Sequence, residues 1–321
     1  TFGNMLESFF SAHPKVDMDT GELFNIGIIP GLRTKLQIMK LNNIGEITNK
    51  NTISLGNYRM IHDIALTEKY VIVPMQPFEI RKTDLFLSLI GLQPVGQGFR
   101  WYTDQSYSSF LIFSRDDLSL QSTIQVPSFS FYHTCNACDN ADGTISLYIA
   151  KHCGQRDELE TKFKSIQTSS FLPEDQCDLW RYDLDVMSQI CIENTLVSGL
   201  AKKIEFPVVN PYRIGKPFRY AYSPCIISQG YHDSYQKLDI RSGRIKVYSL
   251  PLNCYANECL FIPAMTQPTD REDDGSLLSL IYNSDLHISE ILILEAKSMQ
   301  LQARIPLSYH IPYHFHGNFV N

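Results

Sequence analysis

Charge is scarce in this chain of 321 residues, and the charge that is present does not cluster. Asp, Glu, Lys and Arg make up 19% of the residues and leave a net charge of −6, whereas ordinary soluble domains contain about 25% charged residues. No run of Lys and Arg forms a basic stripe, so we expect no nucleic-acid partner. The low charge indicates additional apolar surface, such as a lined tunnel or a membrane-facing patch.

Long apolar runs are missing as well. The longest candidate, Leu85–Leu92, falls short of the roughly 18 residues that a membrane-spanning helix needs. Two basic residues, Arg81 and Lys82, precede it. The segment therefore has two interpretations, a short helix packed on the rest of the fold or a peripheral contact that dips into one membrane leaflet and admits a lipid-soluble substrate.

Cysteine is sparse for a chain of this length, with eight residues, which argues against a disulfide scaffold. Cys135 and Cys138 form one CxxC without a second, so buried thiols in a reducing compartment are favoured over a zinc or redox site. The chain starts at Thr1 without a basic and apolar leader. We expect a cytoplasmic location, with or without peripheral membrane attachment, and a start that lies inside a domain.

Short runs of β-branched and aromatic residues recur along the whole chain, each bounded by Gly, Pro, Asn or Asp. They are Leu36–Leu41, Tyr70–Val73, Phe110–Phe113, Ile145–Ile149, Phe218–Tyr222, Ile245–Leu250, Leu277–Tyr282 and Ile291–Leu294. Regular short strands are typical of a sandwich, a barrel or a propeller. No linker or low-complexity stretch interrupts them, so we expect one all-β domain over residues 1–321.

Related turn sequences separate several of these runs. Asp17–Gly21 and Asp239–Gly243 each combine an Asp that can cap the turn with a Gly that can take a positive φ, and Lys297–Met299 occupies the same place between two later runs. Helix is expected only at residues 83–91 and 157–166, and at residues 185–194, where a strand followed by a turn is the alternative.

Four of the nine histidines lie at the edges of expected strands: His13, His62, His133 and His316. In a propeller the innermost strand of every blade faces the axis, so one histidine from each of several blades would converge on one axial metal. Such a site needs no local metal-binding motif. Imidazole suits Fe, Zn, Cu and Ni alike, so the pattern by itself leaves the metal open.

Six sequence blocks carry a resemblance to a known family. They are Ala12–Asp17 with Thr20–Glu22, His62–Glu68, Tyr132–Ala137, Glu205–Asn210 with Arg219–Tyr220, Glu272–Leu278 and Ile311–Gly317. In this order, and over nearly the whole chain, they resemble the carotenoid cleavage oxygenases, which include the vertebrate retinoid isomerase and the lignostilbene dioxygenases.

The resemblance implies a seven-bladed β-propeller with short helices and loops capping one face. It also implies one non-haem Fe(II) per chain, with His13, His62, His133 and His316 as its ligands. Glutamates hold the remote ring nitrogens of three ligands in this family, and Glu205 and Glu258 match two of them. A carboxylate in that position fixes the tautomer of an imidazole and orients its ring.

Three departures from the family accompany the resemblance. The chain begins just before the first ligand, so we expect a C-terminal part of the family's domain that lacks its N-terminal blade or blades and the third glutamate. His314 stands where the family usually has Gly. Cys138-Asp139 replaces an aromatic and acidic pair, which we expect to alter packing without affecting the ligand.

The resemblance implies a dioxygenase that cleaves a C=C bond of an apolar, conjugated substrate, a carotenoid or apocarotenoid, with O2 to give two carbonyl products. Stilbene cleavage by the same iron site is the first alternative; it would use a Tyr/Lys pair, and Lys15 and Lys69 lie near ligand motifs. A non-catalytic or truncated propeller is the second. A zinc hydrolase is less favoured, because no general base accompanies the histidines.

Overall fold

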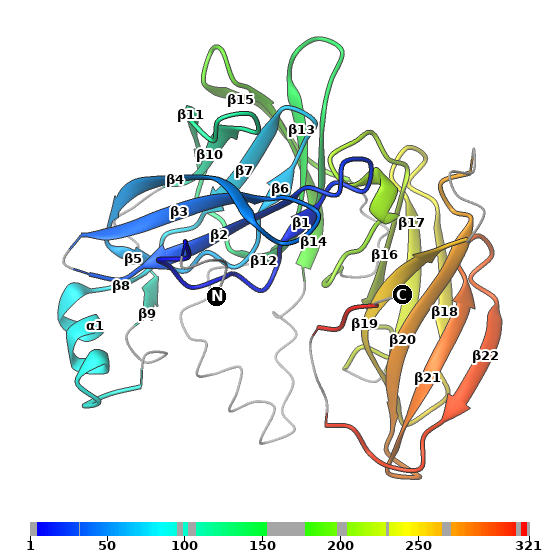
Figure 1. Ribbon diagram of the computed structural model, residues 1–321. Coiled ribbons are helices and arrows are strands. Elements are labelled where there is room, and N and C mark those ends of the chain that lie inside the picture. The colour runs from blue at the N-terminus through cyan, green and yellow to red at the C-terminus, as the bar shows by residue number, and fades with distance from the viewer. Residues whose placement is uncertain are drawn as a thin grey trace.

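The computed structural model describes residues 5–31, 33–94, 99–101, 107–152, 177–197, 204–228, 231–264, 271–312 and 316–319. These residues are nearly all β, with α1 (Lys82–Leu89) as their one α-helix and η3 (Pro211–Arg213) as a short 3-10 turn. They form six antiparallel sheets. Figure 1 shows the first sheet in blue on one side of the molecule and the fifth in yellow to red on the other.

Five of the sheets are ordered along the chain. The first contains β1 (Lys15–Val16), β2 (Leu23–Ile29), β3 (Thr34–Leu41) and β4 (Ile47–Gly56); the second β6 (Ala65–Leu66), β7 (Tyr70–Met75), β10 (Tyr107–Ser114) and β11 (Leu120–Pro127); the third β12 (Phe131–Asp139), β13 (Ile145–His152), β14 (Cys177–Asp185) and β15 (Ile190–Leu196). The fourth contains β16 (Tyr220–Cys225), β17 (Ser234–Asp239) and β18 (Ile245–Ser249), and the fifth β19 (Cys254–Pro263), β20 (Gly275–Asn283), β21 (Ile288–Glu295) and β22 (Leu301–Pro306).

A small sixth sheet is inserted into the second. It consists of β5 (Tyr58–Arg59), β8 (Phe78–Ile80) and β9 (Phe99–Trp101). The helix α1 follows β8 directly and projects at the edge of the molecule (Figure 1). Among the described residues, no helix is both long enough and apolar enough to cross a membrane.

Each of the five ordered sheets packs on the next, and four buried apolar clusters fill the spaces between them. Phe24 and Leu36 of the first sheet meet Val73 of the second. Similar clusters join the second sheet to the third, the third to the fourth and the fourth to the fifth. Strands such as β7 and β10 are therefore covered on both faces and read as continuous apolar runs.

This serial packing is how neighbouring blades of a propeller meet, and the all-β prediction is confirmed. The described sheets do not close on one another, so the number of seven blades stays a prediction. What matters for function is where each sheet starts. The first strands β1, β6, β12, β16 and β19 are all edge strands, and contacts join β6 to β12 and β16 to β19.

All three expected turns are present. Gly21 and Gly243 have φ values of 72° and 68°, and each donates its N–H to the carbonyl of the Asp four residues earlier. Met299 adopts the same conformation, with a φ of 63°. The turn geometry is thus shared by the three hairpins, although only two of them use glycine.

The helix predictions have mixed outcomes. The segment expected at residues 83–91 forms α1 (Lys82–Leu89). Residues 185–194 are not helical but form the end of β14, a turn and the start of β15; Gln189 in the turn has a φ of 59°, a conformation that a right-handed helix does not contain. The third expected helix, at residues 157–166, lies outside the described residues.

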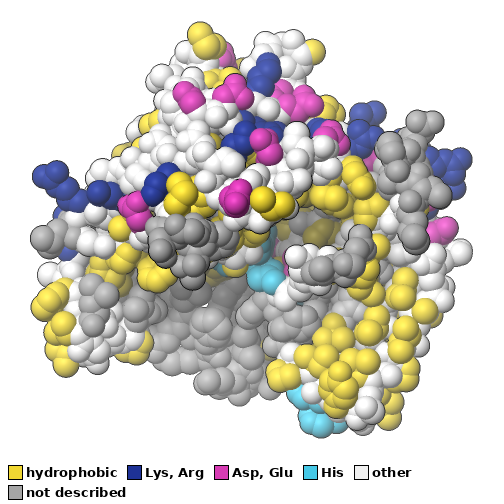
Figure 2. All heavy atoms as spheres, viewed as in Figure 1, with side chains coloured by type: hydrophobic (Ala, Val, Ile, Leu, Met, Phe, Trp, Pro, Cys, Tyr) yellow, Lys and Arg dark blue, Asp and Glu magenta, His cyan; other side chains and the backbone are white. Residues whose placement is uncertain are grey.

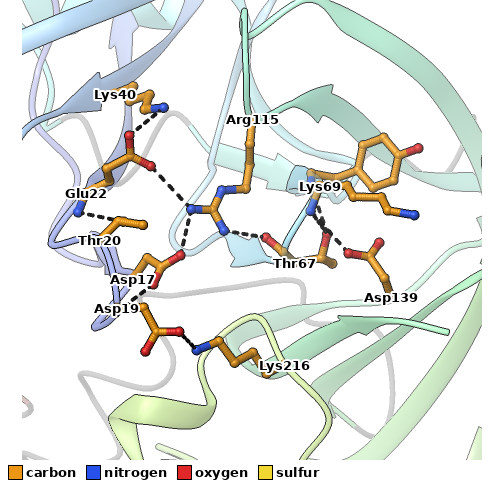
Figure 3. Close-up of polar contacts among 11 residues, drawn as sticks. Asp17, Asp19, Thr20, Glu22, Lys40, Thr67, Lys69, Arg115, Asp139 and Lys216 are labelled. Carbon is orange, nitrogen blue, oxygen red and sulfur yellow. Dashed lines mark hydrogen bonds and ion pairs between the residues drawn. The ribbon is translucent and has the colours of Figure 1, made fainter. Parts of the chain in front are cut away.

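Arg115 clamps the first hairpin to the second sheet (Figure 3). Its guanidinium donates to Asp17 Oδ2 over 2.8 Å and to the carbonyl oxygen of Thr67 over 3.0 Å. Lys216 forms an ion pair with Asp19 in the same turn. The turn that follows the first candidate ligand, His13, is therefore held from two sides.

Candidate metal centre

The structure brings together the four histidines that the sequence singled out. His13 and His62 lie just before β1 and β6, His133 lies on β12, and His316 lies beyond β22. One ring nitrogen from each can be chosen so that all four lie within 4.8 Å of one another. Figure 2 shows histidine side chains beside a hollow near the middle of the face in view. Four nitrogen donors at this separation could hold one metal ion.

The four rings meet edge to face or tilted, as ligands directed at one point do. The Nε2 atoms of His13 and His62 are 3.0 Å apart. The ring of His13 has its centroid 4.4 Å from that of His316 and 5.0 Å from that of His133. Strands from three different sheets and the end of the chain must fold together before these side chains can meet.

Glu205 orients His133. Its Oε2 accepts a hydrogen bond from His133 Nδ1 over 2.8 Å, which leaves the lone pair of Nε2 free to bind. That Nε2 atom is buried, and no described residue offers it a hydrogen bond. A buried polar atom normally has a partner, so this orphaned nitrogen is the observation that best fits a metal ion at the centre.

Glu258, on β19, contacts the ring of His316 as Glu205 contacts that of His133. Its Oε2 lies 3.2 Å from His316 Nδ1 and accepts the backbone N–H of Gly317 over 3.3 Å. With Nδ1 engaged by Glu258, Nε2 is the nitrogen of His316 left to bind a metal. Both glutamates named from the sequence thus contact an imidazole of the cluster.

Burial decides the charge of His13 and His62. It lowers the pKa of His13 to about 3 and that of His62 to about 4, so both rings are neutral at physiological pH, which is the form that binds metals. Burial alone would also lower the pKa of His133, but the carboxylate of Glu205 outweighs it and raises that pKa. In turn, and against its own burial, His133 holds the pKa of Glu205 at about 2.

Phe206 forms a wall of the cluster that the sequence reasoning missed. Its ring centroid lies 4.9 Å from that of His133 and 5.5 Å from that of His316. The residue has a φ of 51°, an uncommon conformation for a bulky side chain that costs on the order of 1–3 kcal/mol and is concentrated at functional sites. The sequence contains no signal for this backbone strain. The position of Phe206 directly after Glu205 is the one feature that could have drawn attention to it.

A second group, also missed, lies behind Glu205. His152 Nε2 is 3.5 Å from Glu205 Oε1, so the carboxylate lies between two imidazoles. Cys177 Sγ is 3.0 Å from one ring nitrogen of His152 and 3.5 Å from the other. These nearly equal distances place the sulfur beside the ring rather than in line with either lone pair, so the group is better described as packing around Glu205.

Other candidate residues are outside the cluster. Cys135 and Cys138 are buried on β12, and burial raises the pKa of their thiols to about 12 and 11, so both stay protonated. Neither belongs to a group of potential metal ligands among the described residues. Asp139, in the pair that departs from the family, accepts the backbone N–H of Lys69 over 3.1 Å (Figure 3). His314 lies outside the described residues.

Comparison with known proteins places this centre in context. Apocarotenoid-15,15'-oxygenase of Synechocystis sp. is 28% identical over 321 residues, which are 97% of this chain and 63% of that protein. The chloroplastic 9-cis-epoxycarotenoid dioxygenase NCED6 of Arabidopsis thaliana is 24% identical over 324 residues, 100% of this chain and 53% of the relative. The chain therefore spans between about half and two thirds of the length of these relatives.

Solved structures agree with the sequence matches. A glutamate-to-glutamine mutant of the Synechocystis apocarotenoid oxygenase has a TM-score of 0.85 at 27% identity, covering 99% of this chain and 66% of its own. A cobalt-substituted form of the Synechocystis protein has a TM-score of 0.85 at 28% identity, with 99% and 67% covered. The family model described as retinal pigment epithelial membrane protein matches residues 1–321. With oxygenases as relatives and a match along its whole length, the chain belongs to the carotenoid cleavage oxygenase family.

Proposed function

We propose that the protein is a non-haem Fe(II)-dependent dioxygenase that cleaves a C=C bond of a carotenoid or apocarotenoid with O2, giving two carbonyl products. The observation that carries the proposal is the convergence of His13, His62, His133 and His316 on one point. The names of the relatives, which are apocarotenoid and epoxycarotenoid oxygenases, support the reaction and the substrate class.

The four histidines would hold one iron through ring nitrogens, with Nε2 used by His133 and His316 because Glu205 and Glu258 face their Nδ1 atoms. When bound, Fe(II) supplies the redox chemistry that activates O2. Neutral imidazoles leave the ion its full charge. The reaction adds both oxygen atoms across the alkene, so no side-chain acid or base has to move a proton, which fits a site built of imidazoles and aromatic rings.

Aromatic rings line the centre and would exclude water from it. Phe206 packs against His133 and His316, and Tyr132 lies 5.6 Å from His62 between ring centroids. A water-poor site protects reactive intermediates from side reactions. The same rings offer an apolar surface to a conjugated substrate.

Stilbene cleavage, the alternative within the family, receives less support. It would need a lysine to hold a phenol, yet Lys15 is already paired with the buried carboxylate of Asp63 over 2.9 Å. We therefore place the polyene substrate first. Because each sheet packs on the next, we also propose that residues 1–321 act as one domain.

We propose peripheral membrane contact through the segment Leu85–Leu92. Phe86, Ile90 and Leu92 are 60%, 51% and 71% exposed, whereas Leu85 is buried and anchors the helix. In Figure 2 apolar side chains cover the corner of the molecule where α1 lies. We also propose a cytoplasmic location, because the seven described cysteines are free thiols, which suits a reducing compartment.

Liposome flotation tests the membrane contact. Phe86→Ser removes an exposed aromatic ring whose burial is worth about 2 kcal/mol, so we expect the affinity for liposomes to fall about 30-fold. Leu286→Ser, at a residue 65% exposed on the β20–β21 turn, is the matched control. Equal flotation of wild type and both variants would reject the contact.

The first test of the function is metal content after anaerobic purification, followed by incubation with an apocarotenoid under ¹⁸O2. We expect about one iron per chain and one labelled oxygen in each carbonyl product. His287→Ala, at a histidine on the β20–β21 turn away from the cluster, should change neither result. A protein without iron would favour the non-catalytic alternative, and zinc with no oxygen consumption would argue for different chemistry.

A further inference from the structure

Asp63 is a buried carboxylate, and together with its partners it adjoins three of the four candidate ligands. It follows His62 directly. Its Oδ1 lies 2.9 Å from Lys15 Nζ, and Lys15 is two residues beyond His13. Its Oδ2 accepts the backbone N–H of Thr134 over 2.8 Å. The Thr134 hydroxyl lies 2.8 Å from both Asp63 Oδ2 and the carbonyl oxygen of Ile64, and shares its one proton between them; Thr134 follows His133.

The surroundings of Asp63 are what a buried charge requires. Its side chain is 2% exposed and that of Lys15 is 19% exposed. An ionised carboxylate in such a position is tolerated only when it is paired and hydrogen-bonded, and besides Lys15 and Thr134 the backbone N–H of Ile64 donates to it over 2.7 Å. The group is therefore held in one orientation by four donors from three segments.

Those segments lie on or just before the first strands of three sheets. Lys15 lies on β1, Asp63 precedes β6 and Thr134 lies on β12. One carboxylate thus joins the starting points of the first, second and third sheets, immediately beside the backbone of His13, His62 and His133. Moving any of the three strands would move a histidine and break a bond to Asp63 at the same time.

We propose that Asp63 is a positioning residue of the metal centre, which sets the separation of His13, His62 and His133 by pinning Lys15 and Thr134. The inference rests on the proposed function, because it assumes that the cluster binds a metal. Such a role would explain how His13 and His62 are held, since among the described residues no carboxylate hydrogen-bonds the ring of either.

The chain offers a matched control in the small sheet. Glu79 on β8 pairs with Arg59 on β5 over 3.0 Å, and their side chains are 1% and 19% exposed. Distance and burial are nearly the same as for Asp63 and Lys15. Glu79→Gln therefore reports the general cost of neutralising a buried carboxylate, without contact with the histidines.

The test uses Co(II) as a spectroscopic probe in the whole chain. For Asp63→Asn we expect Co(II) affinity to fall about 10- to 100-fold, the range found when groups supporting metal ligands are lost, together with a changed ligand-field absorption spectrum. Glu79→Gln should lose comparable stability in urea with affinity and spectrum unchanged. Equal affinity and spectrum in Asp63→Asn and wild type, or equal weakening in both variants, would overturn the proposal.

Milder variants cover the case in which Asp63→Asn does not fold. Thr134→Val removes one hydroxyl donor while keeping the shape of the side chain, and Thr134→Ser restores the hydroxyl. We expect weaker Co(II) binding and an altered absorption spectrum in Thr134→Val, and wild-type binding and spectrum in Thr134→Ser. A wild-type spectrum in Thr134→Val would count against the positioning role of Asp63. If wild type binds Co(II) but the iron-loaded protein cleaves no polyene, the proposed function fails while the positioning role stands.

Discussion

The two halves of the histidine cluster are held in place in different ways. His133 and His316 each contact a glutamate through the ring, over 2.8 and 3.2 Å. His13 and His62 have no such partner among the described residues; their rings approach one another to 3.0 Å, and it is the neighbouring backbone that Asp63 fixes. An imidazole can thus be oriented through its remote nitrogen or through the strand that carries it, and this centre combines both.

Loss of a histidine ligand should lower metal affinity more than any other change, whichever half of the cluster it belongs to. His62→Ala removes one of four donors, and we expect metal affinity to drop by more than about 100-fold, beyond the loss caused by removing a supporting group. Iron content by mass spectrometry after anaerobic purification measures this. A His62→Ala variant that kept a full complement of iron would show that the cluster does not bind iron as a unit.

Neutralising Glu205 or Glu258 should weaken metal binding through His133 or His316 only, and the two variants should differ in size of effect. Glu205→Gln is expected to weaken metal binding about 10- to 100-fold, because its bond to His133 is short and His133 is 8% exposed in its side chain. Glu258→Gln should cost less, since its bond is longer and the side chain of His316 is 31% exposed. Co(II) titrations of both variants test the order, and a reversed order would mean that burial does not rank the two halves.

Breaking the contact between Arg115 and Asp17 in the first hairpin should lower the stability of the fold and leave metal binding unaffected. Asp17→Asn removes the closer of the two carboxylates that face Arg115 and leaves only Glu22, at 3.5 Å, so we expect a loss of about 2 kcal/mol in the free energy of unfolding. Despite its burial, the pKa of Asp17 is lowered by Arg115. The carboxylate therefore stabilises the fold above its unfolded pKa of about 3.9 and loses this contribution as the pH falls below that value.

Urea unfolding at several pH values measures this contribution. The difference between wild type and Asp17→Asn should be constant near neutral pH and shrink below about pH 4. Co(II) affinity should be the same in both proteins at neutral pH. A weaker affinity in Asp17→Asn would extend the region that positions His13 as far as the turn.

Much of the fold could be predicted from local sequence. The runs at Leu36–Leu41, Tyr70–Val73 and Phe110–Phe113 all lie within strands of the structure, because β-branched and aromatic residues between turn formers are a strong local signal. The segment at residues 185–194 was ambiguous for the opposite reason, since its two short apolar stretches fit either period. The order in which sheets pack on one another has no local signature at all.

The candidate site divides in the same way. His13, His62, His133 and His316, with Glu205 and Glu258, could be named because the sequence around them resembles motifs of the carotenoid cleavage oxygenases. The roles of Phe206, His152 and Asp63 could not be predicted, although Phe206 and Asp63 stand inside those motifs. They depend on a strained φ, on a neighbour behind a carboxylate, and on a carboxylate shared by three segments.

By itself the sequence determined the all-β class and the hairpin turns, since each depends on properties of a few consecutive residues, and its resemblance to a known family singled out the candidate ligands and their glutamates. The tertiary structure alone decided that the first strands of the sheets gather, that two histidines face carboxylates while two do not, and that Asp63 joins three of their strands. Those outcomes depend on contacts between residues separated by 48 to 72 positions, and such contacts form only when whole sheets pack.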